Sequence, residues 1–182
     1  MSISSLSPKD ILVRRWKDCA RCTYADTRKN VAVVRGTLPC QVLFVGSSPE
    51  KSEDLRGEPF IGKIGSLCAA ALGAASSLED LPIISHAFTH VCACYPGHDA
   101  AFSGLPDTNV FACQARFEHV VKVANPKVVV LMGKDASEHY ASMFTGCLRM
   151  PDAAYIVRKG GVSSPLFHRM VRDLANAMKE VL

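Results

Sequence analysis

Eight cysteines stand out in this chain of 182 residues, and four of them are spaced as metal ligands are. Cys19 and Cys22 form a C-x-x-C pair, so one tight loop can present both thiolates to one metal ion. Cys94 precedes a loop, and Cys113 lies within a helical pattern. Four thiolates from separate segments suit either a tetrahedral zinc ion or a four-cysteine iron–sulfur cluster, and the spacing does not choose between them.

The other cysteines and two histidines leave alternatives open. A redox C-x-x-C usually follows a strand and begins a helix, whereas this pair lies between a helix and a loop. Cys92 would point the same way as Cys94 on a strand. His98 and His119 are further candidate ligands, although four cysteines already complete a site. The rest lie in or beside apolar segments and are expected to be small core residues: Cys40, Cys68 and Cys147.

The segments that must position these residues alternate between strand and helix patterns. β-branched or apolar runs predict strands at 31–34, 41–45, within 82–91, at 127–132 and at 153–157. Apolar spacing and capping residues predict helices from Ser7, over 64–72, 107–124 and 135–144, and from Pro165 onward. This alternation predicts a single domain over 1–182, a three-layer α/β/α sandwich with a central, mostly parallel sheet. Its ligands would bind beyond the carboxyl ends of the strands, where 46–49, the segment after Phe88, and Gly133 meet.

Composition narrows the function classes. Hydrophobic residues are 48% and charged residues 21%, as in ordinary globular proteins, and no apolar run reaches the ~18 residues of a membrane helix. No secretory signal pattern opens the chain, so we expect a cytoplasmic, reducing location where cysteines stay unpaired. The net charge of +4 permits a nucleic-acid partner without requiring one. Neither a Walker A sequence nor a G-x-G-x-x-G fingerprint occurs, so nothing supports nucleotide hydrolysis or nicotinamide chemistry.

Several motifs, taken in order, resemble the iron–sulfur (family 4) branch of the uracil-DNA glycosylase superfamily. The family's C-x-x-C is matched by Cys19 and Cys22, and its G-E-A-P-G-x-x-E-D in part by residues 46–54. Its G-x-P-F-V-G-x-x-G corresponds to 57–65, its T-N-V-V-K-C-R-P to 89–96, and its P-K-V-I-V-x-L-G-x-x-A to 126–136. The resemblance covers nearly the whole chain.

The resemblance implies a cofactor, a partner and a base platform. Cys19, Cys22, Cys94 and Cys113 would bind a structural [4Fe–4S] cluster, with zinc as the alternative. DNA would be the partner of a monomeric protein. Phe60 would stack on a flipped base, which is worth about 1–3 kcal/mol per base. Four further residues would complete the base-binding site: Gly46, Ser48, Pro49 and His90.

Three positions depart from the residues that the family uses for chemistry. Ser47 replaces a glutamate, so the carboxylate expected beside the sugar is missing. His90 replaces the asparagine that reads the uracil edge, and an imidazole has its donor and acceptor on opposite sides of the ring. Met150 replaces a histidine that donates to the base carbonyl, and methionine has no donor.

Two functions remain open from the sequence. One is a DNA glycosylase with altered base choice, in which Ser47, His90 and a carboxylate from Glu53, Asp54 or Glu50 act at the site. It would flip a deaminated or modified base into a pocket and hydrolyse its N-glycosidic bond. The other is a catalytically inactive relative that binds DNA or a protein partner.

Several basic residues could bind DNA phosphates. The strongest group is Arg158, Lys159 and Gly160, because a glycine lets the backbone approach a phosphate closely. Lys63 is a further candidate.

Overall fold

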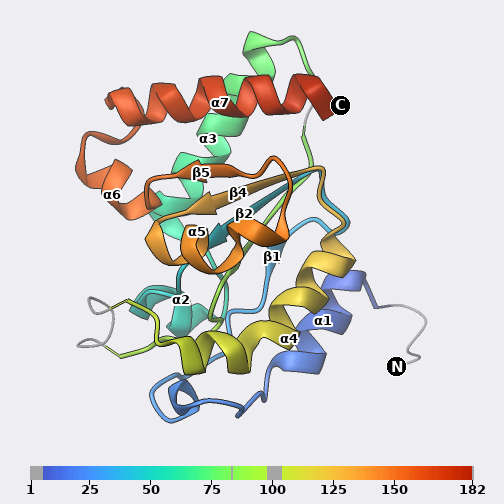
Figure 1. Ribbon diagram of the computed structural model, residues 1–182, viewed down its shortest axis with the longest axis vertical. Helices are drawn as coiled ribbons and strands as arrows, with labels where there is room; N and C mark the ends of the chain where they lie inside the picture. The colour runs from blue at the N-terminus through green and yellow to red at the C-terminus, as the bar shows by residue number, and fades with distance from the viewer. Residues whose placement is uncertain (1–5, 83, 98–103, 182) are drawn as a thin grey trace.

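A computed structural model of the chain describes residues 6–82, 84–97 and 104–181 (Figure 1). Its central sheet has the strand order β1-β3-β2-β4-β5. Only the short edge strand β1 is antiparallel to its neighbour, and the other neighbouring strands are parallel. The strands are β1 (Arg35–Gly36), β2 (Val42–Gly46), β3 (His86–His90), β4 (Val128–Met132) and β5 (Leu148–Met150).

Helices cover both faces of this sheet and complete the predicted three-layer sandwich (Figure 1). One face packs against α1 (Pro8–Trp16), α4 (Asp107–Ala124) and α5 (Lys134–Tyr140). The other face packs against α3 (Gly62–Leu78), α6 (Ala153–Arg158) and α7 (Pro165–Val181). The remaining helices are short: α2 (Lys51–Arg56), η2 (Thr23–Ala25), η4 (Ala141–Met143) and η5 (Gly161–Ser163).

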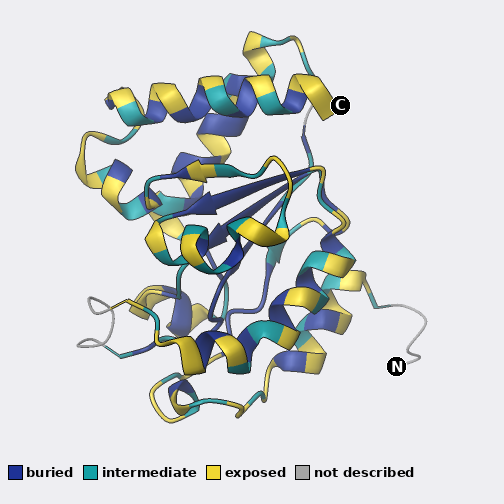
Figure 2. Cartoon of the chain, in the orientation of Figure 1, coloured by how far each residue is buried: buried dark blue, intermediate teal, exposed yellow. Residues whose placement is uncertain are grey.

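Alternation along the central strands explains why the sheet is covered twice. In β2, Leu43 and Val45 pack on the α4 side, whereas Val42 and Phe44 pack on the α3 side. Successive side chains of a strand point to opposite faces, so a strand that is apolar at every position needs a helix layer on each side. Figure 2 shows the result, with buried strands between helices whose outer faces are exposed.

The helices at both ends of the chain and α4 begin as predicted. Ser7 and Asp10 form a capping box on α1, and α4 runs over the predicted 107–124. Pro165 begins α7.

Two predicted strands are wrong. Residues 153–157 lie in α6, because the Asp152 carboxylate accepts hydrogen bonds from the backbone N–H groups of Ala154 (2.9 Å) and Tyr155 (3.3 Å) and so caps a helix. The strand of this region is β5, which ends just before that cap. Residues 31–34 are buried but are not assigned to a strand, and β1 begins only at Arg35.

Candidate functional site

A cleft of about 510 Å³ opens at the carboxyl ends of the parallel strands, and we call it the strand-end cleft. The predicted gathering of 46–49, the segment after Phe88 and Gly133 is confirmed here, because residues 47–49, Tyr95 and Gly133 line the cleft. Charged and polar side chains face it from several elements. They are Ser47, Ser48, Glu50, Lys51, Tyr95, Lys134, Asp135, Asp152 and Arg158.

A second, much smaller hollow continues inward from this cleft, and we call it the inner pocket. Its volume is about 40 Å³, and its walls include Gly46, Phe60 and His90. It shares Ser47, Ser48, Glu50, Asp152 and Ala154 with the strand-end cleft. An apolar cavity of roughly 150 Å³ is known to hold benzene. The inner pocket in this conformation is therefore too small for a pyrimidine base.

The His90 ring fills the space beside the predicted base platform. It stacks on Phe60 with ring centroids 4.9 Å apart and an interplanar angle of 22°. Phe60 also stacks on Phe88, at 5.2 Å, and only 2% of Phe60 is exposed. A methyl group on Gly46 would lie 2.7 Å from His90 Nδ1, so only glycine permits this close packing. A base could stack on Phe60 only after the imidazole moved aside.

A buried carboxylate holds His90 in place. His90 Nε2 lies 3.4 Å from both Glu53 carboxylate oxygens, and the Glu53 side chain also accepts hydrogen bonds from the backbone N–H groups of Glu50 (2.6 Å) and Phe60. Burial would raise the pKa of Glu53, but His90 and these two donors outweigh it and lower that pKa below its ordinary value. Glu53 therefore supports both the platform and the imidazole, and its oxygens are already engaged.

The backbone of Phe60 is held in an unusual conformation. Its φ is 55°, a left-handed value that bulky residues rarely adopt. The Arg35 side chain donates hydrogen bonds to the carbonyls of Pro59 (2.8 Å) and Phe60 (2.5 Å). Strain of this kind costs about 1–3 kcal/mol and persists only where surrounding contacts fix it. Arg35 and Glu53 supply those contacts.

The structure separates the three candidate carboxylates. Glu50 lines both the strand-end cleft and the inner pocket. Burial, followed by the nearby charges of Glu53 and Asp152, raises the pKa of Glu50, although His90 and Arg158 oppose this. Asp54 lies apart from the cleft, because its carboxylate accepts hydrogen bonds from the backbone N–H groups of Lys29 (2.9 Å) and Asn30 (3.0 Å).

The remaining substituted positions differ in their access to the cleft. Ser47 lines both hollows, as predicted for a residue at the end of β2. Met150 is 5% exposed and packs in the core between the sheet and α7. Its thioether therefore lines neither hollow.

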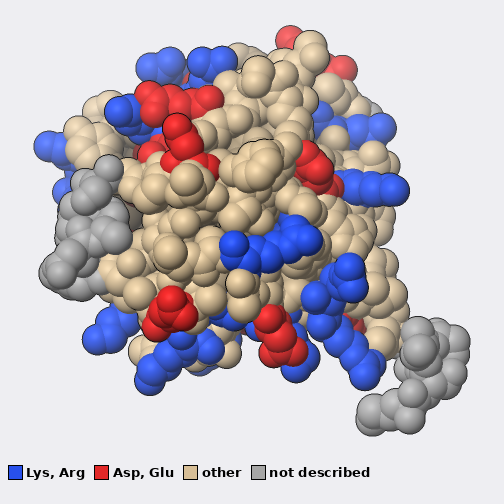
Figure 3. Space-filling view, turned by 60° about the horizontal axis from the view of Figure 1, so that its bottom comes forward, with Lys and Arg blue, Asp and Glu red and all other residues tan. Residues whose placement is uncertain are grey.

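The predicted phosphate-binding residues lie mainly on α6 and the turn after it. Arg158 lines the strand-end cleft, and Lys159 Nζ lies 5.6 Å from the centre of the Tyr155 ring. Gly160 has a φ of 109°, which glycine adopts readily. Lys63 is exposed at the start of α3 and lines neither hollow. Figure 3 shows a further face where basic side chains form separate groups with acidic groups between them.

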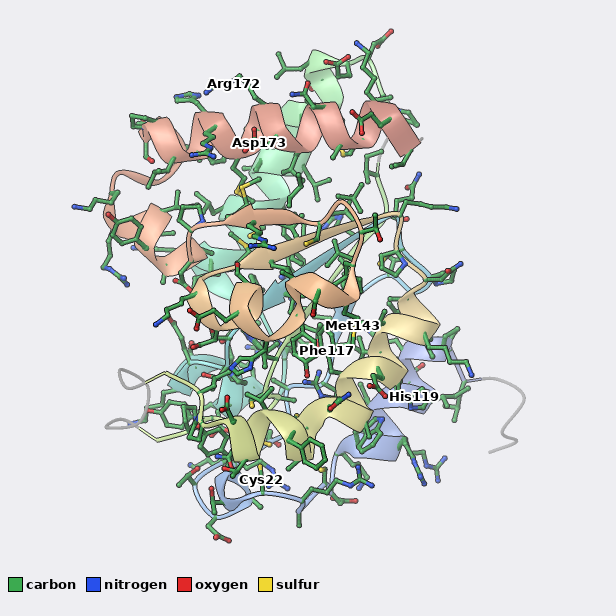
Figure 4. The ribbon with its side chains drawn as sticks, viewed as in Figure 1. Cys22, Phe117, His119, Met143, Arg172 and Asp173 are labelled. Atoms are coloured by element: carbon green, nitrogen blue, oxygen red, sulfur yellow. The ribbon has the colours of Figure 1, made fainter. Side chains whose placement is uncertain are left out.

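The four predicted metal-ligating cysteines lie close together beside α4, the helix that carries Cys113. Cys22 lies in the loop beneath the N-terminal end of this helix (Figure 4). Burial, with smaller contributions from the nearby thiols of Cys113, Cys22 and Cys19, raises the pKa of Cys94 to about 12. No group of three or more His, Cys, Asp or Glu side chains within 6–82, 84–97 and 104–181 has metal-binding geometry. The thiols thus lie near one another, but they are not arranged with the geometry of metal ligands.

The surroundings of these thiols nevertheless fit an anionic four-thiolate group. Two arginines lie among them, and the described residues offer no hydrogen-bond partner to Arg28 Nη1 or Arg116 Nε, both buried. The Arg28 charge lowers the pKa of Cys22 and Cys94, against the larger effect of burial. Buried cations need compensating negative charge, which thiolates bound to a metal centre would supply.

The other candidate ligands have different roles. His119 Nδ1 accepts a hydrogen bond from Trp16 Nε1 (3.0 Å), and His98 lies outside the described residues. Cys40 and Cys68 are buried as expected, whereas Cys147 is half-buried. The Cys92 thiol hydrogen-bonds to Cys113, which raises the pKa of Cys92 and, with help from Arg116 against burial, lowers that of Cys113.

Sequence reasoning missed Arg116, which is 1% exposed. The sequence offers one clue to the burial of Arg116. This residue lies three residues after Cys113 and directly before Phe117, on the apolar face of α4. A charged residue at such a position needs a partner inside the protein.

Comparison with known proteins places this geometry in a family. A family model of the uracil DNA glycosylase superfamily matches residues 35–175. A type-4 uracil-DNA glycosylase of Archaeoglobus fulgidus is 28% identical over 157 residues, which are 84% of this chain and 75% of that protein. A type-4 uracil-DNA glycosylase of Thermotoga maritima is 30% identical over 128 residues, which are 70% of this chain and 62% of that protein.

A solved structure agrees on the fold. The solution NMR structure of a candidate uracil DNA glycosylase from Methanosarcina acetivorans aligns with a TM-score of 0.50 and 11% identity, over 82% of this chain and 98% of that one. Among the described residues, no helix combines the length and apolarity needed to cross a bilayer. The family match covers most of the chain and includes β1 to β5. The chain therefore belongs to the uracil DNA glycosylase superfamily.

Proposed function

We propose that this protein binds DNA and hydrolyses the N-glycosidic bond of a deaminated or modified base. One observation carries the proposal: Glu50 lies between the strand-end cleft and the inner pocket, and its pKa is raised. A partly buried carboxylate with a perturbed pKa in a cleft is typical of an acid–base residue. Glu50 lies three residues after Ser47, and Ser47 stands at the position of the glutamate in the family motif.

The proposed roles follow from the charges that the reaction develops. When the base leaves, positive charge grows on the sugar, so the carboxylates of Glu50 and Asp152 would stabilise it. Glu50 would also accept a proton from the attacking water. The hydroxyl groups of Ser47 and Ser48 face the same space and can orient this water. Arg158 would hold a neighbouring phosphate.

Entry of the base requires a local rearrangement. The imidazole of His90 covers one face of Phe60, and Glu53 holds that imidazole. The stacking energy of an incoming base, about 1–3 kcal/mol, must therefore exceed the loss of the Phe60–His90 stack. We expect a base whose exocyclic groups bind the displaced imidazole to be preferred over plain uracil.

Cys19, Cys22, Cys94 and Cys113 would hold an iron–sulfur cluster, with zinc as the alternative. The bound group would cross-link three segments: the loop between α1 and η2, the segment that follows β3, and helix α4. Hydrolysis of an N-glycosidic bond transfers no electron, so no redox step is needed.

Changing Glu50→Gln tests the catalytic proposal. Removing a general base lowers the rate by about 10²–10⁴-fold, so the variant should release far less base from oligonucleotides that contain uracil, hypoxanthine, xanthine or 5-substituted uracils. Alkali cleavage of the resulting abasic sites measures the product. Glu180→Gln, at the exposed end of α7, is the matched control and should retain the wild-type rate. Equal rates in wild type and Glu50→Gln would contradict the role of Glu50.

A catalytically silent DNA-binding protein is the second candidate function, and the stacked His90 ring favours it. His90→Asn would shrink this side chain and uncover Phe60, so DNA with an extrahelical pyrimidine should bind about 1–3 kcal/mol more tightly than to wild type. His86→Asn, on the same strand but outside the inner pocket, should not change affinity. Wild-type protein that binds DNA but gives no abasic sites on any oligonucleotide would establish this second function and overturn the first.

A further inference from the structure

The Arg116 guanidinium connects the cysteine neighbourhood to the inner pocket. It projects from α4, and its Nη1 donates to the Thr89 hydroxyl at 2.8 Å. Its Nη2 donates to the His90 carbonyl at 2.6 Å and to the Val91 carbonyl at 2.5 Å. These acceptors are consecutive residues at the carboxyl end of β3, so one side chain fixes the backbone that carries His90.

The same guanidinium also reaches the cysteines. Arg116 Nη2 lies 3.4 Å from Cys113 Sγ, one helical turn earlier on α4. No carboxylate among the described residues is within ion-pair distance of Arg116. A buried cation with only dipoles and a sulfur as partners is stabilised strongly by any negative charge placed on that sulfur.

We propose that Arg116 is a positioning residue that couples the state of the cysteine site to the placement of His90 over Phe60. The Cys113 sulfur helps to hold the guanidinium between α4 and β3, and the guanidinium holds the His90 backbone. Replacement of the thiol, or loss of a bound metal centre that keeps Cys113 in place, weakens the contact between Arg116 and β3 and frees the imidazole. This inference goes beyond the proposed function, since it concerns the pocket whether or not a base is hydrolysed there.

The reactivity of His90 toward diethyl pyrocarbonate measures this coupling without any enzyme assay. His90 is 5% exposed, so carbethoxylation of its ring, followed by peptide mass spectrometry, reports how often it leaves the pocket. Arg116→Lys keeps the positive charge but loses the fork that bridges several acceptors. We expect His90 in this variant to react about tenfold faster, the change expected when one charge-assisted hydrogen bond is lost.

Matched variants separate coupling from general loosening. Cys113→Ser should also increase the reaction rate of His90, whereas Cys147→Ser, at a half-buried cysteine beside Ala141, should not. Arg35→Lys removes the clamp on Phe60 from the other side and should leave the retained metal per chain unchanged. Arg116→Lys should reduce that retained metal. In both Arg116→Lys and Cys113→Ser, alkylation of the buried Cys68 should stay at the wild-type rate, which excludes global unfolding.

The double variant Arg116→Lys with Cys113→Ser gives the decisive comparison. Because both changes act through one contact, His90 should react no faster in the double variant than in the faster single one. If the two increases in the reaction rate of His90 multiplied in the double variant, the two substitutions would act independently, and the coupling would be overturned. A metal chelator tests the coupling in the wild-type protein, without any substitution. It should also increase the reaction rate of His90. Unchanged His90 reactivity in both the chelated protein and Cys113→Ser would equally overturn the proposal.

Discussion

Glu53 is a carboxylate beside the candidate site, yet its contacts give it a structural role. Its carboxylate caps the backbone at Glu50, holds the Phe60 N–H and pairs with His90. A glutamate beside a glycosidic bond could act on water, but Glu53 lines only the inner pocket, and both of its carboxylate oxygens are already engaged by backbone N–H groups and by His90. The charge that the reaction needs is therefore assigned to Glu50, which lines both hollows.

The lowered pKa of Glu53 predicts how stability depends on pH. A carboxyl group whose pKa is lower in the folded state stabilises the fold above its ordinary pKa, near 4.5, and loses this contribution as pH falls through the lowered value. The free energy of unfolding in urea should thus decrease as the pH is lowered below about 4.5. Glu53→Gln should be less stable at pH 7 and should lose part of this acid dependence. Glu180→Gln should retain it, and an unchanged slope in Glu53→Gln would contradict the assignment.

Helix α6 is an element whose type the sequence pattern did not predict correctly. Residues 153–157 include β-branched and aromatic side chains that favour a strand, yet one carboxylate at Asp152 satisfies two N–H groups and starts a helix. The long elements α4 and α7 and the apolar strands β2 and β4 were predictable, because each carries a full period of buried side chains. Short elements carry too few residues for a periodic pattern to outweigh such local contacts.

The site shows the same division between local and long-range information. The motifs around Gly46 and Cys22 predicted which segments meet at the carboxyl edge of the sheet, and that Cys22 lies near Cys94 and Cys113. They did not predict that His90 would cover Phe60, since this depends on the Glu53 carboxylate reaching across from α2. Nor did they reveal Arg116, whose partners lie on β3 and the residue that follows it.

The cap of α6 gives a prediction at this scale. Asp152→Ala should lower the free energy of unfolding by about 0.5–2 kcal/mol, the usual cost of losing an N-cap acceptor. Ser7→Ala removes the equivalent acceptor from α1 and should cost a similar amount. Because only Asp152 lines the strand-end cleft, only Asp152→Ala should also weaken DNA binding or base release. Urea unfolding and a binding titration on both variants measure the two effects, and equal loss of binding in Ser7→Ala would argue against it.

At the scale of the whole molecule, the net charge is small, and the face shown in Figure 3 has no single dominant charged patch. The net charge is +4, and basic and acidic groups alternate on the face shown in Figure 3. Binding to DNA would therefore depend on a few phosphate contacts near the cleft rather than on a general positive field. Arg158 and Lys159 lie on α6 and directly after it, and in Figure 1 this helix is on the left of the molecule whereas the C-terminal end of α7 is on the right.

This distribution predicts the salt dependence of DNA binding. Each phosphate neutralised on duplex DNA contributes about −0.9 to the slope of log K against log salt concentration. Arg158→Gln should weaken binding for all sequences and reduce the magnitude of this slope by about 1, and Lys159→Gln should act in the same way. Lys179→Gln, whose lysine pairs with Glu79 at 2.9 Å near the C-terminal end of α7, should leave the slope unchanged. If Lys179→Gln changed the slope as much as Arg158→Gln, the contacts would be spread over the surface, and α6 would have no special place in DNA binding.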